Sequence, residues 1–397
     1  MKRLYLFILE VMALLSACAS VPPGSIPFIY YGHLYIQATL QDSIPVSVVY
    51  DTGASHICLD KTFMQSSNFM ENRDNNCVAE MIGGGNNDFI TVPVIVEPLK
   101  ITMGPIDYTE EYSPILNFRE VIGRHIDGLI GIESFANKII LINYVNEYIL
   151  PLPELNDSIL DGFTKIPAQF KDNRIYVDAE LKVDSTQSVK GPFLLDLGAG
   201  TPLVLTSPVR ESLDLTNKAT AQFYSSHYGI GGDGTIGLFR ADSFNMLDDL
   251  DNVVVYASFS NKGSLSESEK YLGILGNGIL SNYDLIIDDL NKSVYARPNQ
   301  NQNKTYQSSS RSHMNYIDRT DICDGWVVTA IYDKGIAQEA GIEIGDIILS
   351  INDRPVKEIT WEEQRRGLDL NGDTRFKVIK KDGSTAVYTL HIHHQIL

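Results

Sequence analysis

The sequence contains no run of about 20 apolar residues of the kind that spans a membrane. Cysteine is scarce, with 4 residues in 397, and no CxxC motif or Cys/His spacing indicates zinc. Basic residues are outnumbered, since 32 Lys and Arg stand against 50 Asp and Glu and give a formal net charge of −18. Such a surface repels nucleic acid and anionic lipid, so we expect neither as a partner.

Helical periodicity is scarce as well. Apolar, β-branched segments interrupted by Gly and Pro predict strands instead, as at 44–51 and 189–198. A chain of 397 residues is too long for a single hydrophobic core, so two or three domains are expected. The sequence therefore predicts a mainly β protein with more than one domain.

Residues 1–18 are typical of an export signal. A positively charged start is followed by an apolar stretch interrupted only by Glu10, and then by LSAC at 15–18. This tetrapeptide resembles the lipobox of bacterial lipoproteins. The resemblance implies an exported cell-envelope protein, periplasm-facing or in the outer membrane, whose membrane contact is a lipid on Cys18 alone. An ordinary secretory signal cut beside Cys18 is the alternative.

An internal repeat organises the middle of the chain. Four blocks recur in the same order: 33–38 and 174–179, 46–55 and 191–200, 82–85 and 230–233, and 127–133 and 272–278, with apolar segments following at 139–143 and 284–288. Asp51 and Asp196 are 145 residues apart (196 − 51), and Gly131 and Gly276 share this offset. Four ordered matches predict two homologous units.

The repeat sets the expected domain boundaries. The two units span 26–150 and 156–298. Residues 299–312 are polar and low in complexity, which predicts a linker because such a segment cannot bury enough apolar surface to order itself. Residues 313–397 are expected to form a separate domain.

The two units resemble the aspartic proteases. Asp51-Thr52-Gly53-Ala54-Ser55 follows an apolar strand and looks like the active-site loop of that family, and the later Leu-Ile-Gly element ends at Gly131. The resemblance implies two tandem retropepsin-like β-barrel lobes in a pepsin-like bilobal arrangement. It also implies an aspartic endopeptidase that acts on a polypeptide substrate.

The resemblance assigns catalysis to Asp51 and Asp196. Two carboxylates at contact distance cannot both ionise, so the pair shares one proton and titrates as a unit. The ionised member takes a proton from water, and the protonated member polarises the scissile carbonyl. This chemistry requires no metal and no cofactor.

The family pattern also assigns support of the two loops to six residues: Thr52, Gly53, Ser55, Gly131, Gly198 and Gly276. Gly has no Cβ and therefore suits the tight turns that carry the Asp residues. By the resemblance, Thr52 hydrogen-bonds across the seam between the lobes, and Ser55 bonds the outer carboxylate oxygen of Asp51.

The second loop departs from this pattern. Leu197 stands where Thr is expected, and Gly200 stands where the first loop has Ser55. Because Leu197 cannot make the cross-seam bond, we expect Thr52 to need another partner. An inactive pseudo-protease that keeps a peptide cleft is therefore an alternative. A second alternative is that Asp51 pairs with Asp51 of another chain, as in homodimeric members.

Gly83, Gly84 and Gly85 resemble the glycine-rich flap of retroviral-type members. In that interpretation the glycines open to admit a polypeptide and close to exclude water. A hairpin tip without substrate contact is the alternative.

Residues 325–356 resemble bacterial PDZ domains. Gly341 is placed to end a short helix, and Gly345-Asp346 to turn the chain into an apolar strand. The resemblance implies that an extended peptide binds by strand addition, which would recruit polypeptides. The stretch at 313–317 lacks the usual carboxylate-loop glycines, so a PDZ fold that packs on the protease halves and binds nothing is the alternative.

The remaining Cys and His residues give weaker signals. Export would permit a disulfide between Cys58 and Cys77, and free thiols are equally acceptable. Three His residues lie near the C-terminus, at 391, 393 and 394, where a polar terminal strand is favoured over a metal site.

Overall fold

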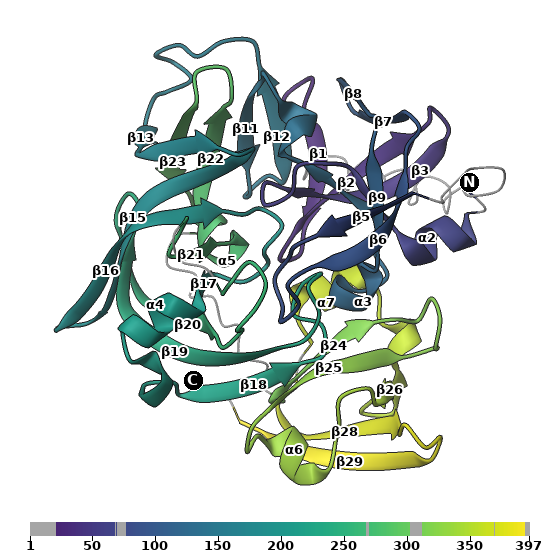
Figure 1. The fold of residues 1–397 in the computed structure, drawn as a ribbon. Helices are drawn as coiled ribbons and strands as arrows, with labels where there is room; N and C mark the ends of the chain where they lie inside the picture. Colours follow the sequence, from purple (N-terminus) through teal and green to yellow (C-terminus); the bar gives the residue numbers. More distant parts are fainter. Residues whose placement is uncertain are drawn as a thin grey trace, which may run out of the picture.

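The computed structural model describes residues 21–67, 69, 77–266, 270–301, 312–368 and 370–393. The export signal with Cys18, most of the predicted linker and His394 lie outside these ranges. In the described ranges, no helix has the length and apolar character needed to cross a membrane. The chain is mainly β, as predicted, with two barrel-like lobes followed by a smaller domain (Figure 1).

Lobe 1 is mostly short strands: β1 (Ile26–Tyr30), β2 (Leu34–Leu40), β3 (Ile44–Asp51), β4 (Cys58–Asp60), α2 (Lys61–Ser66), β5 (Cys77–Met81), β6 (Ile90–Ile95), β7 (Leu99–Met103), β8 (Ile106–Glu110), β9 (Ser113–Leu116), α3 (Arg119–Ile122), β10 (Gly128–Gly131), η1 (Ile132–Phe135), β11 (Ile139–Asn143) and β12 (Tyr148–Leu152). Lobe 2 has longer hairpins: β13 (Thr164–Ile166), β14 (Ala168–Lys171), β15 (Arg174–Asp184), β16 (Gln187–Leu195), β17 (Leu203–Leu205), α4 (Ser207–Ser212), η2 (Leu215–Asn217), β18 (Ala221–Ser225), β19 (Gly234–Asn245), β20 (Asp249–Ser258), β21 (Gly273–Leu275), α5 (Asn277–Leu280), β22 (Tyr283–Asp288) and β23 (Ser293–Pro298). The C-terminal domain follows: β24 (Met314–Asp318), β25 (Trp326–Tyr332), α6 (Ile336–Ala340), β26 (Ile347–Ile351), β27 (Arg354–Pro355), η3 (Val356–Glu358), α7 (Trp361–Arg366), β28 (Gly372–Ile379) and β29 (Thr385–Ile392).

The repeat found in the sequence is also present in the strand register. In lobe 1, β10 runs parallel to β3 and places Gly128 opposite Val48. In lobe 2, β21 runs parallel to β16 and places Gly273 opposite Phe193. Both pairs differ by the same 145 residues, so each lobe supports its Asp-bearing strand with the equivalent neighbour.

The two lobes are joined by a shared antiparallel sheet. Its strands follow the order β13-β23-β22-β11-β12-β1, so β22 of lobe 2 pairs directly with β11 of lobe 1. The register places Ile287 opposite Ile140 and Leu285 opposite Ile142. These are the two apolar segments that follow the repeated glycine elements, and every residue of β22 is buried. Because the two strands pair edge to edge, their buried apolar side chains join in one continuous layer instead of standing apart in two cores.

The hydrophobic cores match this arrangement. One buried cluster runs through both lobes and includes Tyr50 and Leu197 beside the two Asp loops. A separate cluster around Trp326 and Phe376 belongs to the C-terminal domain. The lobes therefore form one packed body, and the C-terminal domain has a core of its own.

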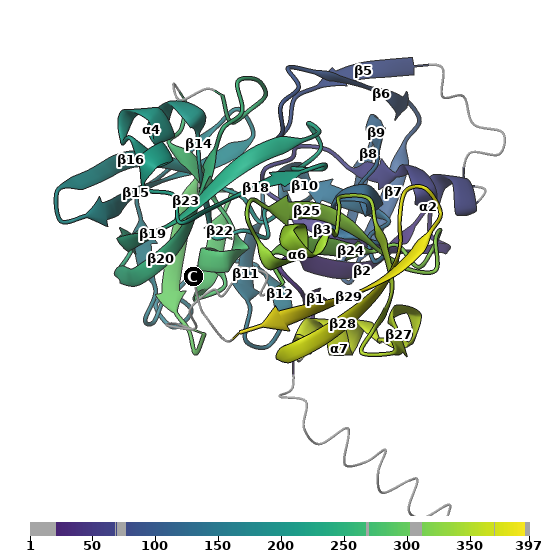
Figure 2. The same ribbon diagram turned by 90° about the horizontal axis from the view of Figure 1, so that it is seen from below.

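The C-terminal domain is nevertheless packed against both lobes. Strand β18 of lobe 2 pairs antiparallel with β25, with Phe223 opposite Tyr332, so the sheet continues from one domain into the other. Both views show β18 and β25 side by side (Figures 1 and 2). On the other side, α7 contacts lobe 1. There the rings of Trp361 and His125 stack, with centroids 4.4 Å apart and an interplanar angle of 4°.

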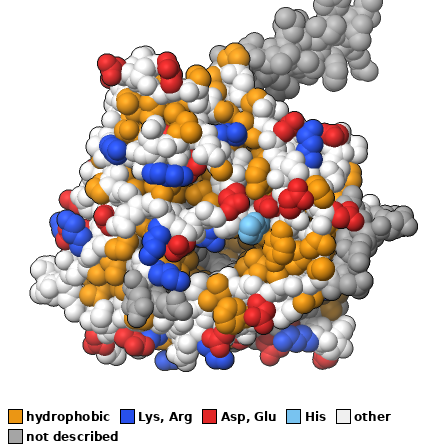
Figure 3. All heavy atoms as spheres, turned by 45° about the horizontal axis from the view of Figure 1, so that its top comes forward, with side chains coloured by type: hydrophobic (Ala, Val, Ile, Leu, Met, Phe, Trp, Pro, Cys, Tyr) orange, Lys and Arg blue, Asp and Glu red, His pale blue; other side chains and the backbone are white. Residues whose placement is uncertain are grey.

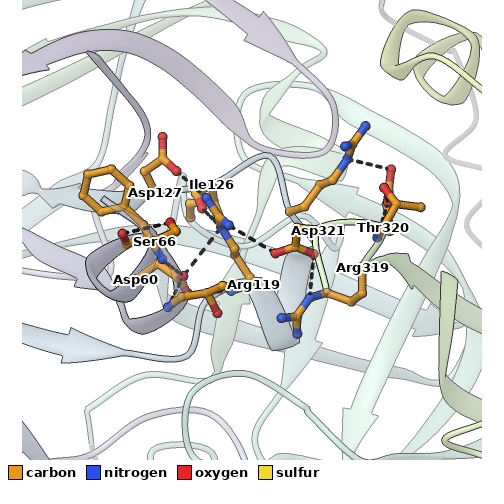
Figure 4. A network of polar contacts seen from close by, with 12 residues as sticks. Asp60, Ser66, Arg119, Ile126, Asp127, Arg319, Thr320 and Asp321 are labelled. Carbon is orange, nitrogen blue, oxygen red and sulfur yellow. Dashed lines mark hydrogen bonds and ion pairs between the residues drawn. The ribbon is translucent and has the colours of Figure 1, made fainter. Parts of the chain in front are cut away.

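A partly buried arginine strengthens the contact with lobe 1. The Arg119 guanidinium pairs with Asp127 at 2.7 Å and with Asp321 of the C-terminal domain at 3.1 Å, and its Nε donates to the Ile126 carbonyl (Figure 4). The backbone N–H of Arg119 donates to the buried carboxylate of Asp60 at 3.0 Å. Because one planar guanidinium satisfies groups on two domains, the C-terminal domain is held in a defined orientation.

Candidate active site

The two predicted catalytic residues sit on matching tight turns. The Gly53 N–H donates to Asp51 Oδ1 at 2.7 Å, and the Gly198 N–H donates to Asp196 Oδ1 at 2.8 Å. Asp51 is the last residue of β3, and Asp196 directly follows β16. Both loops thus present one carboxylate in the same way.

The loops meet so that each carboxylate lies over the other loop's glycine. A Cβ on Gly53 would lie 2.7 Å from Asp196 Oδ2, and a Cβ on Gly198 would lie 2.2 Å from Asp51 Cγ. The side chains of Asp51 and Asp196 also hydrogen-bond each other. A residue larger than glycine at either position would displace the opposite carboxylate. The structure thus brings the predicted pair into contact within one chain.

The environment favours one shared proton. Burial raises the pKa of Asp196 well above its usual range, and the neighbouring Asp51 raises it further. Burial also raises the pKa of Asp51, but hydrogen bonds from Asp196 and Gly53 and the charge of Arg174 oppose that rise. Asp51 is therefore the better site for the negative charge and Asp196 for the proton.

Thr52 corrects one expectation from the sequence. Its buried hydroxyl donates to the Leu195 carbonyl at 2.7 Å and accepts from the Leu197 N–H at 3.0 Å. Thr52 needs no substitute partner, because the groups that it binds across the seam belong to the backbone of the second loop. The prediction was wrong because it assumed that Thr52 binds a side-chain hydroxyl of the second loop, whereas it binds backbone groups.

A residue that the sequence reasoning missed also ties the second loop to lobe 1. Asn277, which follows Gly276, is fully buried, and its Nδ2 donates to the carbonyls of Leu197 at 2.7 Å and Gly32 at 3.0 Å. The Tyr144 hydroxyl donates to its Oδ1 at 2.7 Å. The only sequence signal was a polar residue in an otherwise apolar element.

Ser55 has a different partner from the expected one. Its Oγ accepts a hydrogen bond at 2.8 Å from Nη1 of Arg174, which reaches it from lobe 2. No hydrogen bond from Ser55 to Asp51 is present among the described residues. The backbone of Ser55 also lies close to Gly131 at the end of β10, since a Cβ on Gly131 would lie 2.1 Å from the Ser55 backbone. On the other loop, a Cβ on Gly276 would lie 2.3 Å from the Thr201 carbonyl oxygen.

The predicted flap is the tip of the hairpin formed by β5 and β6. Its glycines meet the turn between β18 and β19: the Gly231 N–H donates to the Gly84 carbonyl at 2.6 Å. The Ser264 N–H donates to the Gly83 carbonyl at 3.2 Å. Gly85 has a φ of 125°, and a Cβ there would lie 2.4 Å from the Gly231 backbone. The two Ile-Gly-Gly segments matched in the sequence therefore touch, with glycine against glycine.

We expect Gly85→Ala to loosen this contact and Gly84→Ala to leave it intact. Alanine at 85 combines a positive φ with a backbone clash and should cost about 1–3 kcal/mol. A Cβ at Gly84 meets only the Tyr228 carbonyl at 3.5 Å. Amide exchange of Gly231, followed by NMR, should accelerate roughly five- to hundredfold in Gly85→Ala, as that energy implies. Equal exchange rates in both variants would contradict the closed contact.

The dyad opens into one large cavity of about 1720 Å³. Its walls come from all three parts of the chain: the two Asp loops, the flap, and residues of β24 and α7 such as Tyr316, Asp318, Trp361 and Gln364. The space-filling view shows a hollow near the centre of one face, bordered by hydrophobic, acidic and basic side chains and by a His (Figure 3). A polypeptide in this cavity would contact the C-terminal domain as well as the dyad.

Among the described residues, one cluster has the residue types and closeness needed to hold a metal ion. The candidate ligand atoms of His56, Glu110 and Glu133 lie within 4.8 Å of one another. His56 Nδ1 lies 3.3 Å from Glu110 Oε2, and the Tyr108 hydroxyl donates to the same oxygen at 2.9 Å. Both contacts are to one oxygen of the buried Glu110 carboxylate.

The cysteines of the described part of the chain are free thiols. Cys58 is buried, Cys77 is exposed and Cys323 is half-buried. Of the two alternatives that the sequence left open, the structure has the free thiols and not the Cys58–Cys77 disulfide.

Comparison with known proteins identifies the C-terminal domain. Residues 327–375 match the PDZ domain family, which confirms the PDZ prediction. Among solved structures, the chain is similar to an aspartic proteinase from Irpex lacteus, with a TM-score of 0.45 and 12% sequence identity. That similarity covers 71% of this chain and 99% of the other. No curated protein matches the sequence.

Proposed function

We propose that the chain is an aspartic endopeptidase. The observation that carries this proposal is the hydrogen-bonded pair of Asp51 and Asp196, joined across the seam of two lobes in a large cavity. Peptide hydrolysis by the aspartic-protease route needs such a pair, with one carboxylate ionised and the other protonated. The raised pKa of Asp196 and the Arg174 charge that favours ionised Asp51 both support that state.

In the proposed reaction, Asp51 accepts a proton from a water that attacks the scissile carbonyl. Asp196 donates its proton towards the carbonyl oxygen and so stabilises the charge that develops there. The tetrahedral diol then collapses: Asp51 passes its proton to the leaving nitrogen, the C–N bond breaks, and Asp196 takes back a proton from the diol, which restores the dyad. The loop glycines and Thr52 hold the two carboxylates in register, since small displacements of reacting groups slow a reaction strongly.

The PDZ domain is proposed to receive part of the same polypeptide. Tyr316 and Asp318 of β24 line the cavity that contains the dyad, and α7 faces them. PDZ domains bind extended peptides by strand addition, and this position would place a bound segment beside the cleft. Export as a lipoprotein through Cys18 is part of the proposal and is supported by the sequence of residues 1–18.

A pseudo-protease is the second candidate, and the side chains of Leu197 and Gly200 favour it. Both differ from the pattern of the first loop, and neither supplies a hydroxyl. Against this, Thr52 and Asn277 already supply buried hydrogen bonds to the second loop. A binding protein would keep the cavity without hydrolysing its occupant.

Cleavage of an unfolded polypeptide by residues 21–397 separates the two candidates. Products would be identified by mass spectrometry between about pH 3 and 7, with and without pepstatin, alongside circular dichroism to verify folding. We expect cleavage that pepstatin blocks. Binding without cleavage by a folded chain would instead support the pseudo-protease.

A further inference from the structure

Another side chain occupies the place where the second loop lacks a hydroxyl. A Cβ on Gly200 would lie 3.2 Å from both Cε1 and Nε2 of His33. The His33 ring also hydrogen-bonds the backbone of Gly198. Its Nδ1 has no hydrogen-bond partner in the described residues. His33 therefore contacts the loop of Asp196 at two points.

The position of His33 is fixed from both lobes. Its imidazole packs edge-on against Tyr35 of β2, with centroids 6.1 Å apart. The preceding residue, Gly32, accepts a hydrogen bond from Asn277, and the same amide binds Leu197. The turn that carries the imidazole and the loop beside Asp196 are thus anchored to one buried side chain.

The internal repeat gives His33 a counterpart. His33 aligns with Arg174 in the repeat. Strand β2 begins directly after His33, and strand β15 begins at Arg174. Arg174 crosses the seam to Ser55 on the first loop. Each lobe therefore sends one basic side chain to the Asp loop of the other: Arg174 to the loop of Asp51, and His33 to that of Asp196.

Building on the proposed peptidase activity, we propose that His33 is a positioning residue that fills the place of the missing loop hydroxyl and holds Asp196 in line with Asp51. The two basic side chains differ in charge. Burial lowers the pKa of His33 to about 4, and the bond to Gly198 opposes this only in part. The ring is neutral above that pH and leaves the proton on Asp196, whereas the permanent charge of Arg174 favours ionised Asp51.

The contact can be tested without any activity, by a double-mutant cycle in urea unfolding. Gly200→Ser should destabilise the wild-type chain, because the added atoms meet the His33 ring. The same substitution should cost less in a His33→Ala background, where the ring is absent. Additive effects of the two changes would contradict the contact, whether or not the protein cleaves peptides.

The positioning role is tested by steady-state kinetics. We expect His33→Ala to lower kcat about 10²-fold with little change in KM, since a misplaced Asp196 slows chemistry more than binding. His33→Gln retains a donor for Gly198 and should recover most of kcat. In an active wild type, an unchanged kcat in His33→Ala, or no recovery with Gln, would overturn the role. A folded wild type that cleaves nothing would contradict the peptidase proposal, and the unfolding cycle would still decide the contact.

Discussion

Asp51→Asn and Asp196→Asn are each expected to abolish peptide cleavage while leaving the fold intact. Loss of either carboxylate removes the proton acceptor for water or the proton donor for the carbonyl, and such groups contribute roughly 10²–10⁴-fold each. Asparagine keeps the size and the oxygen that accepts from Gly53 or Gly198. The measurement is kcat/KM on one fluorogenic peptide, with Asp42→Asn at an exposed turn as the control.

The pattern of loss separates the possible dyads. Equal loss in both variants supports a dyad within one chain, as the contact between the two side chains requires. If Asp51→Asn alone abolished cleavage, Asp51 would pair with its copy in a second chain. Mixing the two inactive variants provides a further check, because an intramolecular dyad cannot be restored by mixing.

Gly131→Ala is expected to have the largest effect on stability. Its Cβ would lie 2.1 Å from the backbone of Ser55, and backbone atoms on both sides cannot yield as a flexible side chain would. We expect a loss of about 3 kcal/mol or more, at the upper end of overpacking costs. Urea unfolding followed by circular dichroism measures it, and a poorly folded product would agree with the same clash.

Ser134→Ala is the matched control for this substitution. Ser134 lies three residues further along and is buried, and its hydroxyl has no hydrogen-bond partner among the described residues. Removing an unsatisfied buried hydroxyl should be nearly neutral or slightly stabilising. If Gly131→Ala proved as mild as Ser134→Ala, the close crossing beneath the first Asp loop would be contradicted.

The sequence predicted those parts of the fold that repeat at a constant spacing. The 145-residue offset between Asp51 and Asp196 also relates the parallel pairings of β10 with β3 and of β21 with β16. Glycine was informative because any larger residue at Gly53 or Gly198 would displace the carboxylate of the opposite loop. The PDZ prediction rested on short-range turn and helix signals, which do not depend on tertiary contacts.

Contacts with backbone groups could not be predicted in this way. Thr52 binds the backbone of the second loop, so the side chain at Leu197 was a poor guide to its partners. The docking of the PDZ domain depends on Arg119 and His125, which stand in an ordinary polar segment. Arg174 was visible as the counterpart of His33, but its reach across the seam depends on how the lobes are oriented.

The protonation of the dyad tests the central claim most directly. Carboxyl ¹³C resonances of labelled Asp residues would be followed by NMR between about pH 3 and 8, with Asp51→Asn and Asp196→Asn assigning the two signals. We predict that one carboxyl, that of Asp196, stays protonated well above the usual Asp pKa of about 3.9, and that its titration shifts in Asp51→Asn. Two carboxyls that titrate independently near the usual value would contradict a shared proton, and with it the proposed catalytic pair.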